Sequence, residues 1–171
     1  MSFYYGATPL SAAKSKMQAI GTSDFNGVGR VPTPGQFRAM AWSAIIHGAF
    51  GLVYFPIVLK PAFAWDGTPP NLLSEMHTLH SAVDGIADIL INSAHGGRRP
   101  STLRRCANKD SAPIGLQLPY PFEGCEIPTA QAAYKIVLNL VDETTILNDS
   151  RWGLSGLSFY PYEVKYGYAF S

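Results

Sequence analysis

Two aspartates each come shortly after an apolar segment that has the composition of a buried strand. Asp24 follows residues 16–23, in "TSDFN", and Asp66 follows residues 51–56 and a loop, in "AWDGTPP". A pair of carboxyl groups can serve as a general acid and as a base or nucleophile. Each aspartate also suits a simpler role, because Asp bonds its own backbone in turns and "DG" is a turn signal. At this point both interpretations stay open.

The other residues that could do chemistry give weaker patterns. His77 and His80 are three positions apart, which allows a shared metal, but the sequence offers no third ligand near them. Glu75 is expected to be a solvated helix charge, and His47 to be structural at the end of a helix. "GVGRVP" lacks the third glycine of a phosphate-binding loop. We therefore expect no metal and no cofactor.

Composition narrows the class of protein. The chain has 171 residues, of which 47% are hydrophobic and 15% charged, with a net charge of +1. That charge gives no attraction to nucleic acid or to anionic lipid. Residues 1–11 lack a basic start followed by an apolar stretch, so we expect no secretory signal. Cys106 and Cys125 are expected to be reduced thiols, with a single bridge as the alternative in an exported protein.

The longest uncharged run, residues 39–59, is 21 residues long and could be mistaken for a membrane span. Its local signals divide it instead. Thr33, Pro34 and Gln36 form the pattern of a capping box at the start of a helix of about fourteen residues. "GLVYFP", Gly51 to Pro56, then resembles a short buried strand. We therefore expect a helix, a turn and a strand in a soluble core, and no membrane partner.

The first half of the chain shows alternating strand and helix patterns. A strand over Lys16 to Ser23 and a strand over Gly51 to Pro56 flank the helix just described. A second helix is expected to begin with Thr68 as its cap. One face of that helix is apolar, since its apolar residues alternate at four and three positions: Leu72, Met76, Leu79, Val83, Ile86 and Leu90. This order predicts a parallel sheet covered by helices.

After residue 97 the composition changes. "AYKIVLNLV", "ETTILN" and "LSFYPYEVKYGYAF" are rich in β-branched and aromatic residues and are separated by turn formers. This pattern predicts antiparallel strands. The sequence therefore divides into an α/β segment over residues 1–97 and an antiparallel β domain over residues 98–171.

The stretch "RVPTPGQFRAMAWSAIIHGAFGLVYFP" resembles a segment near the end of the (β/α)8 barrel of glycoside-hydrolase-like proteins. "DGTPPNLLSEMHTLHSAVDGIADIL" is similar to the last barrel helix of that family, and "LSFYPYEVKYGYAF" to its C-terminal β domain. The resemblance implies that residues 16–23 and 51–56 are barrel strands seven and eight. It implies a fold of class α/β plus β, in which a partial barrel-like βαβα unit precedes an antiparallel β-sandwich-like domain. Since a complete barrel takes about 250 residues, the chain resembles a truncated or minimal form.

The same resemblance implies a function in carbohydrate chemistry. Asp24 lies where such proteins place a carboxylate, and Asp66 would complete a two-carboxylate pair for hydrolysis of a glycosidic bond. Tyr54 and Trp65 would contact the sugar. The alternatives are a non-catalytic carbohydrate-binding or interaction module, and a fragment that needs a partner chain or a second copy of itself. Whether the chain is itself an enzyme stays open.

Overall fold

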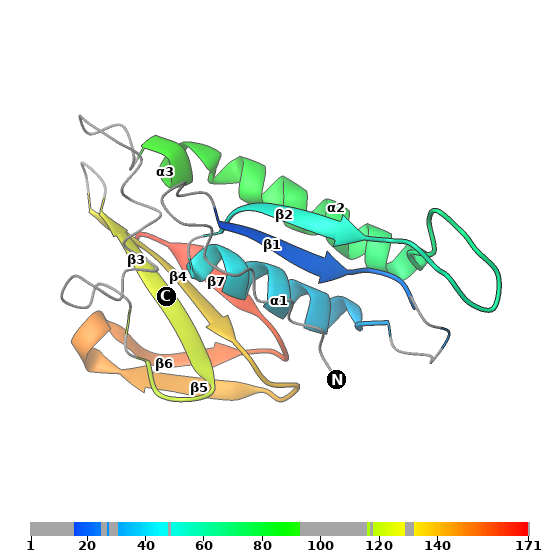
Figure 1. Cartoon of the computed structure of the whole chain (residues 1–171). Helices are drawn as coiled ribbons and strands as arrows, with labels where there is room; N and C mark the ends of the chain where they lie inside the picture. The colour runs from blue at the N-terminus through cyan, green and yellow to red at the C-terminus, as the bar shows by residue number, and fades with distance from the viewer. Residues whose placement is uncertain are drawn as a thin grey trace.

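The computed structural model describes residues 16–24, 27, 31–47, 49–92, 116, 118–128 and 132–170. The elements of the first half are two strands, β1 (Lys16–Gly21) and β2 (Ala49–Phe55), and three helices, α1 (Pro34–Ile46), α2 (Pro70–Gly85) and α3 (Ala87–Asn92). Among its described residues, the second half holds strands and one short 3-10 turn, η1 (Ser150–Trp152). Its strands are β3 (Phe122–Pro128), β4 (Ala133–Asn139), β5 (Thr145–Asp149), β6 (Leu154–Phe159) and β7 (Val164–Gly167). The protein thus mixes a helix-covered α/β half with antiparallel sheets (Figure 1).

β1 and β2 lie side by side and run parallel, as the sequence predicted. Ile20 is paired with Tyr54, and Gly21 with Phe55, so the two strands end at the same edge. Within the described residues this sheet contains only these two strands. Figure 1 shows α2 behind the pair and α1 between the pair and the strands of the second half.

α1 begins as its sequence predicts. Thr33 caps the helix by accepting from the Gln36 backbone N–H at 3.2 Å, and the Gln36 side chain accepts from the Thr33 N–H at 3.0 Å. The helix is buried on more than one face, because Trp42 and Ile46 are buried as well as Phe37 and Ile45. The reason is that α1 lies between β1 and β2 on one side and β3 and β4 on the other. A helix that is covered on several sides is apolar on several sides.

α2 and α3 follow the predicted apolar stripe, in which Leu72, Leu79, Ile86 and Leu90 are buried. The expectation that Thr68 caps the helix is wrong. Pro69 occupies the cap position and makes no side-chain capping bond, while the Thr68 hydroxyl is hydrogen-bonded to the Thr22 hydroxyl at 3.0 Å. The Thr68 side chain therefore joins the end of β1 to the segment before α2 instead of capping the helix.

The second half forms two antiparallel sheets, with strand orders β3-β4-β7 and β5-β6. The prediction of antiparallel β structure is confirmed for the described residues. β3 was not predicted. Its sequence, "FEGCEIP", contains two glutamates, a glycine and a proline, all of which are depleted in strands.

Two hydrophobic clusters hold these elements together. The larger one combines α1, α2 and β1 with residues of β3 and β4, among them Cys125 and Ile136. The smaller one lies between the two antiparallel sheets and includes Val137, Leu147 and Phe159. The expected boundary between residues 97 and 98 lies outside the described residues, as does Cys106, the partner expected for any bridge to Cys125. Among the helices that the structure describes, none has the length and apolar character that crossing a bilayer would require.

Candidate functional site

The loops that follow β1 and β2 are bonded to each other at the carboxyl edge of the parallel pair. The Ser23 hydroxyl donates to the Ile57 carbonyl at 2.7 Å, and the Thr22 N–H donates to the Phe55 carbonyl at 3.0 Å. Within the loop after β2, the Gly67 N–H donates to the Pro56 carbonyl at 2.7 Å. Ligand and catalytic sites of parallel sheets lie at this edge, because the connecting loops converge there.

Asp24 and Asp66 both belong to this edge. Asp24 is half-buried and directly follows Ser23, whereas Asp66 is exposed and directly precedes Gly67. A Cβ atom added to Gly67 would lie 3.3 Å from the Ser23 Cβ, so the two loops are in close contact beside both aspartates. The structure therefore places Asp24 and Asp66 on neighbouring loops, each next to a residue of this contact.

The turn roles that the sequence left open are also present. Asp66 Oδ1 accepts from the Thr68 N–H at 3.0 Å, which is an Asx turn. The Asp24 carbonyl accepts from the Gly27 N–H at 3.4 Å, and Gly27 has a positive φ of 66°. A turn role and a chemical role do not exclude each other, since the Asx turn uses one oxygen of the Asp66 carboxylate. The catalytic assignment stays a prediction.

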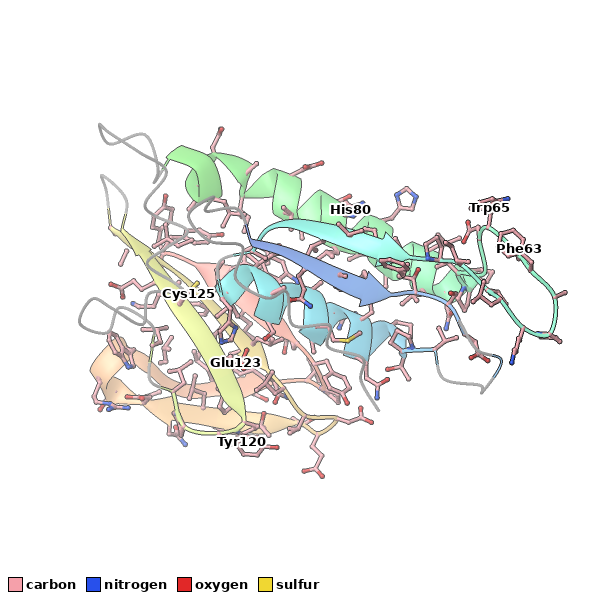
Figure 2. The ribbon with its side chains drawn as sticks, viewed as in Figure 1. Phe63, Trp65, His80, Tyr120, Glu123 and Cys125 are labelled. Carbon is pink, nitrogen blue, oxygen red and sulfur yellow. The ribbon has the colours of Figure 1, made fainter. Side chains whose placement is uncertain are left out.

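The loop between β2 and α2 presents aromatic side chains to solvent. Val58 and Ala64 exchange two backbone hydrogen bonds of 2.9 Å, which close the loop into a narrow ribbon. On either side of Ala64, the rings of Phe63 and Trp65 meet edge to face, with centroids 4.9 Å apart. Their side chains are 55% and 75% exposed. Figure 2 shows this pair beyond the end of β2.

Tyr54, the other predicted sugar contact, faces the helices and not this loop. Its ring packs against Phe37, and its hydroxyl is hydrogen-bonded to His80 Nε2 at 2.8 Å. Burial between β2 and α2 raises the pKa of the Tyr54 hydroxyl. Tyr54, His80 and the apolar side chains around them line a cavity of about 520 Å³. The structure thus separates Tyr54 from Trp65, and a sugar contact by Tyr54 stays a prediction.

The histidines give no metal site in the described part of the chain, where no group of three potential ligands is found. His80 is bonded to Tyr54, and His47 Nδ1 is 2.8 Å from the Ser43 carbonyl at the end of α1. His47 also lies 3.8 Å from a Glu123 carboxylate oxygen, to which the Ser43 hydroxyl donates at 2.7 Å. This Ser–His–Glu group does not have the order of a catalytic triad, because the serine hydroxyl donates to the carboxylate.

The expectation that Glu75 is a solvated charge is wrong. Glu75 is 8% exposed, and its two oxygens accept from Arg38 Nε at 2.7 Å and Nη2 at 2.6 Å. Hydrogen bonding to Glu75 raises the pKa of Arg38. Sequence reasoning missed this pair because Arg38 and Glu75 meet only when α1 packs against α2. The available signal was a lone glutamate next to the apolar stripe of α2.

Comparison of the chain with family models, curated proteins and solved structures found no match. The functional argument therefore rests on the geometry described above and on the sequence motifs.

Proposed function

We propose that this protein is glycoside-hydrolase-like and binds a carbohydrate at the carboxyl edge of β1 and β2. One observation carries the proposal: the two loops at this edge are bonded together and present Asp24, Asp66 and the exposed Phe63–Trp65 pair in one region. Aromatic rings provide flat apolar contact for a sugar, and carboxylates accept hydrogen bonds from its hydroxyl groups.

The proposed architecture is that of the C-terminal part of a (β/α) barrel with a sandwich-like β domain. The parallel order β1-α1-β2 with a following helix supports two consecutive barrel units. The apolar cluster between the β3-β4-β7 and β5-β6 sheets supports a sandwich-like arrangement.

In this proposal Trp65 is the main sugar contact, because it is the most exposed aromatic residue of the loop. Phe63 supports the Trp65 ring from its edge. Asp66 has its backbone fixed by the turn to Thr68, so its second oxygen can accept from a sugar hydroxyl without a loss of loop order.

The binding proposal is tested by titration of an oligosaccharide panel, followed by calorimetry and by tryptophan fluorescence. Trp65→Ala is expected to weaken saccharide binding by about tenfold, which corresponds to the loss of one good aromatic contact. Tyr160→Ala is the matched control, because Tyr160 is 71% exposed in the other half of the protein. Equal affinities of the wild type and Trp65→Ala would rule out this site.

Hydrolysis is the second candidate function, and the shared location of Asp24 and Asp66 favours it. Two carboxyl groups across a glycosidic bond can act as acid and as base or nucleophile. The test is cleavage of nitrophenyl glycosides and oligosaccharides by the wild type, Asp24→Asn and Asp66→Asn. Activity that depends on both aspartates would support hydrolysis. Saccharide binding without turnover would leave the binding module, and activity that survives both changes would remove the site assignment.

A further inference from the structure

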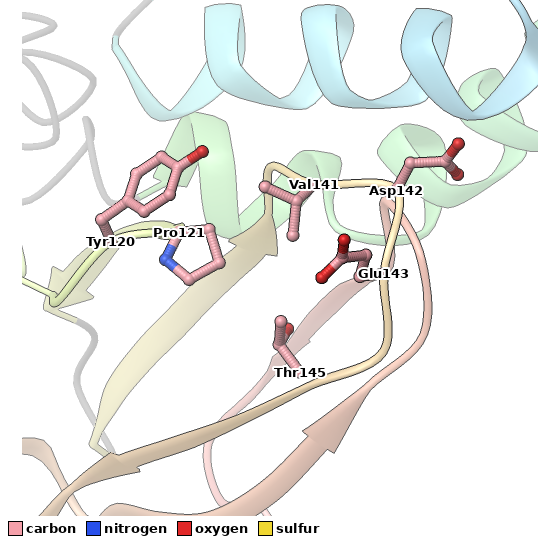
Figure 3. A pocket seen from close by; sticks show the side chains of 6 residues that line it. All are labelled: Tyr120, Pro121, Val141, Asp142, Glu143 and Thr145. Atoms are coloured by element: carbon pink, nitrogen blue, oxygen red, sulfur yellow. The ribbon is translucent and has the colours of Figure 1, made fainter.

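A second cavity lies in the β half of the protein, at a distance from the Phe63–Trp65 loop (Figure 2). It has a volume of about 560 Å³, and Figure 3 shows the six residues that line it: Tyr120, Pro121, Val141, Asp142, Glu143 and Thr145. The pairing of β3 with β4 creates it. Because Phe122 is paired with Asn139, the residues just before β3 lie opposite those just after β4.

The buried side chain of Asn139 holds the turn from β4 to β5 that forms one wall of this cavity. Asn139 Nδ2 donates to the Glu143 carbonyl at 2.8 Å and to the Tyr160 carbonyl at 3.0 Å. Its Oδ1 accepts from the Val141 N–H at 3.3 Å. On the other wall, the Pro121 carbonyl accepts from the Leu140 N–H at 2.9 Å. The walls are thus fixed by backbone groups and by Asn139, without use of the carboxylates.

The two carboxylates at this cavity have no partner in the described part of the chain. No hydrogen bond or ion pair to the Asp142 or Glu143 carboxylate is found there. Thr145 Oγ1 has no hydrogen-bond partner among the described residues either, but it is fully buried and does not face the cavity. In Figure 3 the Glu143 carboxylate points toward the space above Thr145, whereas the Asp142 carboxylate points away from it.

We propose that this cavity binds an ammonium group carried on a short aliphatic chain. An ammonium group has three donors and no acceptor, which complements the unpartnered Glu143 carboxylate. A charge-assisted hydrogen bond to Glu143 would supply most of the affinity. The exposed ring of Tyr120 can face the cation, and Pro121 and Val141 can contact the aliphatic chain. None of the six lining residues is cationic, so a cationic ligand also satisfies the local charge.

A neutral polyol is the competing ligand, since its hydroxyl groups can also donate to carboxylates. It would leave the negative charge of Glu143 uncompensated, and it would bind nearly as well to a glutamine, which is also an acceptor. The ligand charge and the Glu143→Gln substitution therefore separate the two chemistries. This inference does not depend on the carbohydrate proposal, which concerns the other half of the protein.

The experiment is a titration of the full chain with n-pentylamine and with 1-pentanol, followed by the backbone amide signals of Val141 and Thr145 in NMR spectra. We expect n-pentylamine to bind at least about tenfold more tightly than the alcohol. N-acetyl-lysine N-methylamide is a third probe. Binding of this lysine derivative would point to a lysine side chain as the natural ligand, and binding of pentylamine alone would point to a free amine.

The matched variants are Glu143→Gln and Asp142→Asn, which remove neighbouring charges at the same turn. Glu143→Gln is expected to weaken pentylamine binding by about tenfold, and Asp142→Asn by about threefold or less, because its carboxylate points away. Both substitutions are at exposed positions, and their amide spectra will show whether the fold is kept. Equal affinity for amine and alcohol, unchanged affinity in Glu143→Gln, or no binding of either amine would overturn the proposal.

Discussion

Arg38 and Glu75 form an ion pair with two hydrogen bonds between α1 and α2. Both hydrogen bonds are short, and Glu75 is almost fully buried whereas the Arg38 side chain is 32% exposed. A buried carboxylate that loses its only cation becomes a cost to the folded state. We therefore expect the pair to specify how α1 packs against α2, whether or not it adds net stability.

Arg38→Met is expected to lower the free energy of unfolding by about 2 kcal/mol, because it leaves Glu75 buried without its partner. The double variant Arg38→Met/Glu75→Met should recover most of this loss. Urea denaturation of the single and double variants measures both effects. Glu126→Gln is the control, since Glu126 lies 4.0 Å from Lys135 in a partly exposed pair, and a long ion pair near the surface contributes less than about 1 kcal/mol. A stable Arg38→Met variant would contradict the argument.

Asp149 is expected to make stability depend on pH in the acidic range. Its carboxylate accepts from Arg151 Nε at 2.9 Å and Nη2 at 2.6 Å, and these bonds lower the pKa of Asp149 in the folded protein. The unfolded chain has an Asp pKa of about 3.9. The stabilisation is therefore complete above that value and is lost as pH falls through the lower pKa of the folded state.

Denaturation at neutral and at acidic pH measures this effect. Asp149→Asn should reduce the loss of stability on acidification, because the titrating carboxylate is gone. The same pH slope in the wild type and in Asp149→Asn would contradict the assignment.

At the level of elements, local signals predicted the first half well. The capping box located the start of α1, and the apolar stripe located α2 and α3. β3 could not be found in this way, because its strand character comes from its pairing with β4. Gly124 shows why: an added Cβ would lie 2.8 Å from the Ile136 carbonyl oxygen, so this strand needs a glycine, which strand propensity disfavours.

The sequence predicted only part of the candidate site, because side-chain directions and contacts between elements depend on the tertiary structure. Asp24 and Asp66 were found because each follows a strand pattern. The face of β2 was not assigned, although side chains alternate along a strand. In the structure Tyr54 faces the helices, whereas its neighbour Phe55 lies on the other face and is 50% exposed. The Arg38–Glu75 pair depends on the packing of two helices, which no local pattern specifies.

Gly67 is the position at which the two strand-end loops depend most directly on the absence of a side chain. A Cβ atom at this residue would overlap the Val58 side chain and press on Ser23. Gly67→Ala is therefore expected to destabilise the protein by about 1–3 kcal/mol, the range for overpacking, and to weaken saccharide binding. Thermal unfolding and calorimetry measure the two effects.

Gly85→Ala is the control for this substitution. No atom lies within 4 Å of a Cβ added at Gly85, at the end of α2. Since alanine favours a helix over glycine, this variant should be stabilised by about 0.5–1 kcal/mol. The double variant Gly67→Ala/Val58→Ala should regain stability, because it removes the side chain that the new methyl group meets. If it does not, the close contact is not the cause.

At the scale of the whole molecule, the two halves share one core. α1 contributes Trp42 and Ile45 to the cluster that also holds Cys125, Ile127 and Ile136 of the β half. Trp42 stacks on Tyr166 of β7 with ring centroids 5.4 Å apart, and an added Cβ at Gly35 would press on the ring of Tyr162. The change of composition along the sequence therefore marks a change of secondary structure and not a break in packing.

The outer face of the β1–β2 pair exposes apolar side chains to solvent. Val53 and Phe55 lie two positions apart on one face of β2 and are 37% and 50% exposed. In the described residues, β1 and β2 pair only with each other. Parallel strands are normally covered on both faces, and open strand edges pair readily with other chains. We therefore expect this face to bind a second copy of the chain, or a partner chain with further parallel strands.

Sedimentation velocity over a range of concentrations tests self-association of the wild type and Phe55→Lys. The wild type should shift from monomer to dimer as concentration rises, and Phe55→Lys should remain monomeric, because a charge on this face must be desolvated in the interface. Tyr160→Lys is the matched control, because it adds the same charge to an exposed aromatic position of the other half. A dimer that is lost equally in both variants would place the interface elsewhere. A wild type that stays monomeric at every concentration would rule out self-association through this face.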